Sequence, residues 1–137
     1  NSYIVGPTII GEGCEIGPGA VVFPYTSVGN NVVIESFTQL RNCIIGDSVH
    51  IGSHTLLTDT FVGEASSIGP YFTATSSETA MAVGDNSSDV HTGCVISENV
   101  KIGARVIIRP GTMVGPNARI NDNKSIQDDI PESAHVV

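Results

Sequence analysis

The sequence predicts an all-β fold, a single-stranded parallel β-helix in which six-residue repeats build about six triangular coils. Three observations predict it. An aliphatic residue recurs at every sixth position, glycine often follows that residue, and small or β-branched residues occur four positions after it. An α-helix would repeat near 3.6 residues and an ordinary strand every second residue, so neither explains this period.

The aliphatic column runs through most of the chain with two shifts of one residue. Its members are Ile4, Ile10, Ile16, Val22, Val28, Ile34, Leu40, Ile45, Ile51, Leu57, Val62, Ile68, Val90, Ile96, Ile102, Ile108, Val114, Ile120 and Ile126. The shifts fall between Leu40 and Ile45 and between Leu57 and Val62. Three repeats form one coil of three short strands, and coils stack by parallel pairing about 4.8 Å apart. The aliphatic side chains are therefore expected on the axis of the helix.

Two further columns support the coil. The glycines that follow the aliphatic residue are expected where the backbone turns a corner that tolerates no Cβ; they are Gly11, Gly17, Gly29, Gly46, Gly52, Gly63, Gly69, Gly103 and Gly115. The small or β-branched residues are expected inside the corners; they are Cys14, Ala20, Thr26, Val32, Thr38, Val49, Thr55, Cys94, Val100, Val106, Thr112 and Ala118.

Two segments depart from the repeat. Residues 75–89, TSSETAMAVGDNSSD, are polar and glycine-containing, and we expect a loop that projects from one corner. The repeat is expected to resume at Val90. Beyond Ile126 the pattern decays, so residues 1–126 are predicted to form the β-helix and residues 127–137 a C-terminal capping tail, with an extended segment at Ile130-Pro131.

Composition excludes several classes of partner. The chain of 137 residues has 6 Lys and Arg against 14 Asp and Glu, a net charge of -8, which disfavours nucleic acid and anionic membrane surfaces. It contains neither an apolar run of about 20 residues nor the pattern of a signal peptide, which predicts a cytoplasmic protein. Cys14, Cys43 and Cys94 form no CxxC pair, so we expect reduced thiols in the core.

Among the four histidines, His54 is the strongest candidate for chemistry. It lies between the two shifts of the aliphatic column, and departures from a regular pattern are expected at functional positions. The alternative is that the shifts only adjust packing and that His54 is a solvated corner residue. His50 and His54 lack a third ligand at a fixed spacing, so no metal site is predicted. His91 is a second candidate base, and His135 is expected to be incidental.

Residues 6–69, and most specifically residues 36–69, resemble the C-terminal β-helix of bifunctional sugar-1-phosphate nucleotidylyltransferases that also act as glucosamine-1-phosphate acetyltransferases. The resemblance implies a left-handed coil, a homotrimer and acetyl-CoA as co-substrate, with no metal required by this domain. The family's N-terminal nucleotidyl-transferring domain has no counterpart in this sequence, so that reaction would require a further segment.

The same resemblance implies roles for individual residues. His54, in GSHTLLTD, falls on the family's general base, which removes a proton from a substrate amine as the nitrogen attacks the thioester of acetyl-CoA. Arg41, in TQLRN, matches the basic residue that holds the sugar phosphate. Ser53 and Ser67 are expected to contact the acceptor.

Several positions depart from the family's pattern. Phe23-Pro24 stands where the family has arginine before proline, Leu57 replaces an aromatic hydroxyl, and Ser67 replaces an asparagine. Pro70 falls where a backbone N–H helps to stabilise the thioester oxyanion, and proline has no N–H. Losing one such donor typically costs about 10²–10³ in rate.

Two functional hypotheses follow. The first is an acyltransferase that moves an acetyl group from acetyl-CoA to an amino-sugar phosphate in a groove between two subunits of the trimer. The second is a non-catalytic trimerisation or regulatory module of a sugar-1-phosphate nucleotidylyltransferase, which the departures at Phe23, Leu57 and Pro70 favour. A γ-type carbonic anhydrase would need three zinc-binding histidines, and the histidine spacing does not supply them.

Overall fold

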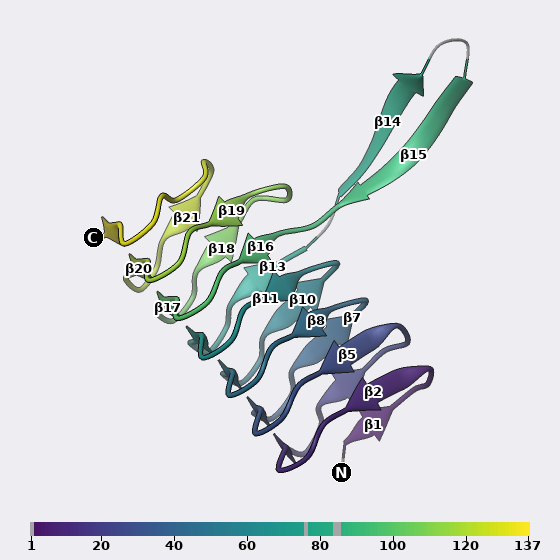
Figure 1. Cartoon of the computed structure of the whole chain (residues 1–137), viewed down its shortest axis with the longest axis vertical. Coiled ribbons are helices and arrows are strands. Elements are labelled where there is room, and N and C mark those ends of the chain that lie inside the picture. Colours follow the sequence, from purple (N-terminus) through teal and green to yellow (C-terminus); the bar gives the residue numbers. More distant parts are fainter. Residues whose placement is uncertain (1, 76, 84–85) are drawn as a thin grey trace.

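The computed structural model describes residues 2–75, 77–83 and 86–137, and it describes the side chains outside residues 76–92. The chain winds into a column of stacked triangular coils, from which one long hairpin projects (Figure 1). Each coil contributes one short strand to each of three parallel sheets, which we call faces A, B and C. The prediction of a left-handed parallel β-helix of about six coils is confirmed.

The strands of each face stack in the order in which the chain passes through the coils. Face A contains β1 (Tyr3–Ile4), β4 (Val21–Val22), β7 (Gln39–Arg41), β10 (Leu56–Thr58), β13 (Thr73–Ala74), β18 (Ile107–Ile108) and β21 (Ser125–Ile126). Face B contains β2 (Thr8–Ile10), β5 (Thr26–Val28), β8 (Ile44–Ile45), β11 (Phe61–Val62), β16 (Val95–Ile96) and β19 (Met113–Val114). Face C contains β3 (Glu15–Ile16), β6 (Val33–Ile34), β9 (His50–Ile51), β12 (Ser67–Ile68), β17 (Lys101–Ile102), β20 (Arg119–Ile120) and β22 (His135–Val136).

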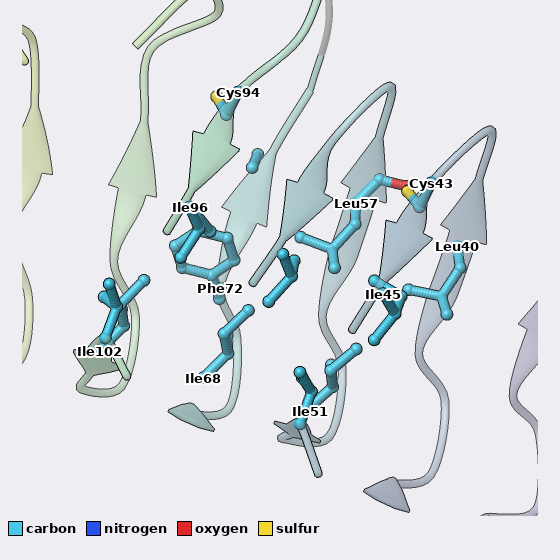
Figure 2. Close-up of a cluster of buried hydrophobic side chains, with 14 of the residues drawn as sticks. Leu40, Cys43, Ile45, Ile51, Leu57, Ile68, Phe72, Cys94, Ile96 and Ile102 are labelled. Atoms are coloured by element: carbon cyan, nitrogen blue, oxygen red, sulfur yellow. The ribbon is translucent and has the colours of Figure 1, made fainter. Parts of the chain in front are cut away.

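The predicted aliphatic column forms the core. The strand register places each aliphatic residue directly on the aliphatic residue of the next coil. On face C, Ile34 pairs with Ile51, Ile51 with Ile68 and Ile68 with Ile102. These side chains fill the interior of the column together with Phe72 (Figure 2). Burial of this apolar surface, at roughly 25 cal/mol per Å², is the main source of stability.

The column of glycines is explained by stacking of the coils rather than by backbone conformation. A Cβ atom on Gly52 would lie 2.6 Å from both the carbonyl carbon of Gly69 and the nitrogen of Pro70 in the next coil. The left-handed backbone conformation falls two positions later, as at Asn31, Ser48 and His54, whose φ angle is +57° in each case. The prediction that these glycines tolerate no Cβ is therefore correct, although the positive φ angle belongs to other residues.

The two shifts of the aliphatic column occupy one corner. We call the edge where the chain passes from face A to face B the A/B corner; Asn42 and Asp59 stack there in successive coils. The Asp59 N–H donates to the Arg41 carbonyl at 3.0 Å, and Asn42 Nδ2 donates to Asp59 Oδ1 at 2.6 Å. Each shift therefore shortens the same corner by one residue in two successive coils.

The projecting segment leaves the same A/B corner one coil further on. It is an antiparallel hairpin of β14 (Ser77–Val83) and β15 (Asn86–Thr92) rather than the predicted loop at 75–89 (Figure 1). Val90 pairs with Thr79 in the hairpin, so the prediction that the coil resumes at Val90 is wrong; the coil resumes at β16. The Gly84-Asp85 dipeptide is a turn signal in the sequence. The segments on either side of it, SETAMAV and NSSDVHT, show no alternation of apolar and polar residues.

Residues after Ile126 continue the stacking. Ile130 bridges Val114, and β22 pairs with β20 through Arg119 with His135 and Ile120 with Val136. These contacts place the C-terminal residues on the last coil, while the division of the chain at residue 126 stays a prediction.

Candidate functional site

The residues predicted to form the site lie at three places in one chain. Ser53 and His54 occupy the C/A corner, the edge where the chain passes from face C to face A. Arg41 lies at the A/B corner, and Ser67 points outward from β12 on face C. Face A separates His54 from the A/B corner by about four strand residues, roughly 13 Å at 3.3 Å per residue.

His54 is an exposed side chain held between two aromatic rings at the C/A corner. Its imidazole stacks on Tyr71 of the next coil, with ring centroids 4.7 Å apart and planes at 9°. Phe37 of the preceding coil covers the other side, with centroids 5.2 Å apart. The two rings restrain the plane of the imidazole, so its nitrogen atoms are presented at the edge of the stack.

Backbone N–H groups at this corner donate hydrogen bonds to carbonyl groups of the neighbouring coil. The His54 N–H donates to the Ser36 carbonyl at 3.0 Å and the Tyr71 N–H to the Ser53 carbonyl at 2.9 Å. Pro70 has no N–H, and its carbonyl accepts a hydrogen bond from Arg105 at 2.9 Å. An oxyanion at this corner would therefore need a donor other than Pro70 or Tyr71.

A pocket lies at the A/B corner, where the two shortened turns stack. It has a volume of about 520 Å³ and is lined by Phe23, Pro24, Tyr25, Arg41, Asn42, Thr58 and Asp59. The guanidinium carbon of Arg41 lies 3.9 Å from the centre of the Phe23 ring, a cation–π contact that orients the charge. The pocket thus combines one cation, one carboxylate and an exposed phenol from Tyr25.

Two of the departures from the family pattern acquire a structural role. Phe23 supplies the ring beneath Arg41. Leu57 is fully buried in the core, so its side chain cannot contact a substrate. Ser67 lies between His50 and Lys101 on face C, and His50 pairs with Glu35 at 3.4 Å.

The sequence analysis missed the aromatic partners of His54 and the neighbours of Arg41. Phe37 and Tyr71 each lie 17 residues from His54, which is the length of a coil that contains one shortened corner. Counting by that length would have found both rings. The second candidate base, His91, belongs to β15, and its side chain lies outside the described residues.

Within the described ranges, no three His, Cys, Asp or Glu side chains gather in a group that could hold a metal ion. The same ranges contain no helix with the length and apolar character needed to cross a membrane.

Comparison with known families places the chain in a class. The hexapeptide repeat of bacterial transferases matches residues 93–127, and the profile of the GMPPB C-terminal domain matches residues 4–83. The fold and these repeats define a hexapeptide-repeat β-helix protein. The chain belongs to the GMPPB C-terminal domain family. The resemblance to the β-helix domain of nucleotidylyltransferases is confirmed, while no curated protein matches the chain at a significant level.

Solved structures with the same fold include several acyltransferases. AntD, an N-acyltransferase from Bacillus cereus in complex with dTDP and 3-hydroxybutyryl-CoA, aligns with a TM-score of 0.74 and 19% identity over 90% of this chain and 74% of its own. The acetyltransferase domain of PglB from Neisseria gonorrhoeae, in complex with acetyl coenzyme A, aligns with a TM-score of 0.60 and 20% identity over 98% of this chain and 50% of its own. A mutant of perosamine N-acetyltransferase from Caulobacter crescentus, in complex with CoA and GDP-perosamine, aligns with a TM-score of 0.60 and 19% identity over 98% and 49%.

Proposed function

We propose that this β-helix is an acyltransferase domain that transfers an acyl group from acyl-CoA to the amine of an amino sugar that carries a phosphate. The observation that carries the proposal is His54, an exposed imidazole restrained between Phe37 and Tyr71, on a chain that bears the hexapeptide repeat of transferases. The likeness to three acyltransferases that were solved with CoA or acyl-CoA supports the same reaction.

In the proposed reaction the substrate amine attacks the carbonyl carbon of the thioester. A neutral His54 nitrogen takes the proton that the amine loses, the C–S bond breaks, and the CoA thiolate receives that proton from the imidazolium. The products are an amide and free CoA. Proton transfer by a positioned base contributes typically about 10²–10⁴ to the rate. Ser53, beside His54, is the group of this corner that we assign to orienting the acceptor.

Arg41 is proposed to bind the anionic part of the acceptor. Its guanidinium is oriented by Phe23 in the pocket at the A/B corner, where Asp59 can accept hydrogen bonds from sugar hydroxyl groups. The width of face A separates this pocket from His54, so a compact sugar monophosphate does not reach both within one chain. A nucleotide-linked amino sugar is longer, and AntD and perosamine N-acetyltransferase were solved with a nucleotide and a nucleotide-linked sugar, respectively.

We also propose that the domain is a homotrimer that meets its neighbours through face B. The outward column of that face runs through Ile44, Phe61, Val95 and Met113 in direct register. Ile44, Phe61 and Met113 are 54%, 43% and 55% exposed in the single chain, which is costly for such side chains in water. A second copy of the chain would cover them.

A cytoplasmic location is part of the proposal. We take acyl-CoA to be a donor that is available in the cytoplasm. The three cysteines are free thiols, two of them buried. Free thiols of this kind are usual in a reducing compartment. Fractionation of cells followed by immunoblotting would test the location, and recovery of the protein outside the cytoplasmic fraction would contradict it.

The decisive experiment compares two histidine variants. His54→Asn removes the base while asparagine tolerates the left-handed backbone at this position. His50→Gln is the matched control, because His50 lies on face C and contacts Glu35. Release of the CoA thiol would be followed with acetyl-CoA and either glucosamine 1-phosphate or a nucleotide-linked amino sugar as acceptor. We expect His54→Asn to lower kcat by about 10²-fold or more and His50→Gln to leave it within about two-fold.

Calorimetric titration with acetyl-CoA separates a catalytic domain from a structural one. Binding that His54→Asn retains, together with lost turnover, supports the proposed base. Absence of acetyl-CoA binding at millimolar concentration would instead assign the domain to trimerisation or regulation. Unchanged turnover in His54→Asn would remove His54 from the reaction.

A further inference from the structure

Face C carries a ladder of basic side chains near the C-terminal end of the column. Lys101, Arg119 and His135 are direct neighbours on β17, β20 and β22, since Lys101 pairs with Arg119 and Arg119 with His135. All three side chains are exposed. Successive strands of a sheet are about 4.8 Å apart, so the three groups form a short, closely spaced row.

This row is unusual for so acidic a chain. The net charge is -8, and five of the six Lys and Arg residues lie between positions 101 and 124. Within the described part of the chain, the one contact of 4.0 Å or less between a basic side chain and a carboxylate is that of His50 with Glu35, so Lys101 and Arg119 have no carboxylate within 4.0 Å. Like charges directly opposite each other on neighbouring strands destabilise a sheet. An anion that bridges the two cations would remove that cost.

The ladder also lines a pocket. A cavity of about 310 Å³ lies between β17, β20 and β22 and is bounded by the three basic side chains together with Gly103, Asn121 and Asp122. The Nε2 atom of His135 lies 3.0 Å from Asn121 Oδ1, a contact that holds the imidazole at the end of the row. Asp122 brings a negative charge to the rim, but its Oδ1 atom accepts the Ala104 N–H at 2.8 Å.

We propose that this ladder binds the diphosphate group of a nucleotide. Two phosphoryl groups joined by one oxygen match two cations on adjacent strands, and a guanidinium can hold phosphate oxygens in a bidentate manner. Gly103 contributes backbone only to the pocket, because the position of its absent side chain is already occupied by Asp122 of the next coil. The inference goes beyond acyl transfer and does not depend on it, because binding is measured without turnover.

Two ligands carry the required chemistry, CoA and a nucleoside diphosphate sugar. Both contain a diphosphate attached to a nucleoside, so the cations alone do not distinguish them. Competition experiments do: displacement of bound pyrophosphate by CoA and not by UDP assigns the acyl donor, and the reverse assigns a nucleotide-linked sugar. Displacement by both means that the site recognises the diphosphate alone.

The test is calorimetric titration of the whole chain with inorganic pyrophosphate and with inorganic phosphate. We expect pyrophosphate to bind about ten-fold more tightly than phosphate, with an affinity that falls as salt is added. Arg119→Gln and Lys101→Gln, both at exposed positions, should each weaken pyrophosphate binding about ten-fold. Arg109→Gln is the matched control, because Arg109 is an exposed cation at the A/B corner, away from face C.

Three results would overturn the proposal. One is that pyrophosphate at about 10 mM shows no measurable binding to the unchanged protein, because a dissociation constant above that concentration is too weak for a specific diphosphate site. Another is equal weakening by Arg119→Gln and Arg109→Gln, which would reduce the effect to net charge. A third is displacement of pyrophosphate by neither CoA nor UDP.

Discussion

The imidazole of His54 lies parallel to the ring of Tyr71, with 4.7 Å between centroids and 9° between planes. Phe37 covers the opposite face at 5.2 Å and a tilt of 36°. With both faces covered, the imidazole can approach a substrate only through its edge, where its two nitrogen atoms lie. Tyr71 is therefore a positioning residue for the proposed base, and it comes from the next coil rather than from the sequence around His54.

Replacing the Tyr71 ring should reduce turnover without removing the base. Tyr71→Asn suits the left-handed backbone at this position, where φ is +60°, and it removes the stacked ring. We expect kcat to fall about ten-fold with KM for acetyl-CoA little changed. A misoriented base slows the proton transfer, but it does not change the contacts that bind acetyl-CoA. Tyr71→Phe keeps the ring and should restore kcat, as measured by release of the CoA thiol.

Two outcomes would contradict this role for Tyr71. If Tyr71→Phe lost as much activity as Tyr71→Asn, the hydroxyl group rather than the ring would be important. If Tyr71→Asn kept full activity, His54 would not need the stack. Thermal unfolding of both variants serves as the control for folding.

Much of the fold follows from the six-residue period, because each aliphatic residue must face the axis if any of them does. The residue numbers also predict that the two shifts of the aliphatic column fall at the same corner. Asn42 and Asp59 are 17 residues apart, which is the length of one coil shortened by one residue. The separation of Arg41 from His54 is implicit as well, since a triangular coil places residues of different corners apart. The short motifs that resemble the family do not contain this separation, so the resemblance alone implies that Arg41 and His54 belong to one site.

Other features depend on contacts between coils that a linear pattern does not contain. The stack on His54 requires aromatic residues at matched places in three coils, and the cation–π contact of Arg41 requires Phe23 one coil earlier. The sequence predicts a loop at the hairpin because residues 75–89 are polar and contain glycine, and because the two strands show no alternation of apolar and polar residues. Composition reports solvent exposure, whereas pairing depends on register.

Gly52 should be among the least replaceable positions of the column. A Cβ atom there would lie 2.6 Å from backbone atoms of Gly69 and Pro70, which cannot move without separating the coils. We expect Gly52→Ala to lower the free energy of unfolding by about 3 kcal/mol or more, measured by denaturant titration. Gly6→Ala is the control, since its Cβ would have only the Thr8 nitrogen nearby, at 3.8 Å. Equal stability of the two variants would refute the stacking explanation.

Phe61 should be essential for self-association if face B is the trimer interface. Phe61→Asp would place an unpaired carboxylate in an apolar contact, which costs several kcal/mol. We expect sedimentation analysis to show a trimer for the unchanged protein and a monomer for Phe61→Asp. Val33→Asp on face C introduces the same charge elsewhere and should leave the trimer intact. A trimer that survives Phe61→Asp would exclude face B, and a monomeric unchanged protein would exclude the trimer.

The thiol of Cys43 should make stability depend on pH above neutrality. Burial raises the pKa of Cys43 from 9.0 to about 11, because the fully buried side chain lies between the Arg41 and Leu57 carbonyls and cannot carry a hydrated negative charge. Since the folded state holds its proton more tightly than the unfolded chain, the thiol stabilises the fold fully below pH 9. This stabilisation is lost progressively as the pH rises towards about 11.

The expected loss over that range is on the order of 2–3 kcal/mol. Denaturant titrations between pH 8 and pH 11 should show a steeper fall in unfolding free energy for the unchanged protein than for Cys43→Ala, which cannot ionise at this position. Cys14→Ala provides the matched control, because Cys14 is only partly buried. If the unchanged protein and Cys43→Ala fell in parallel, ionisation of this thiol would not contribute, and another group would have to account for alkaline destabilisation.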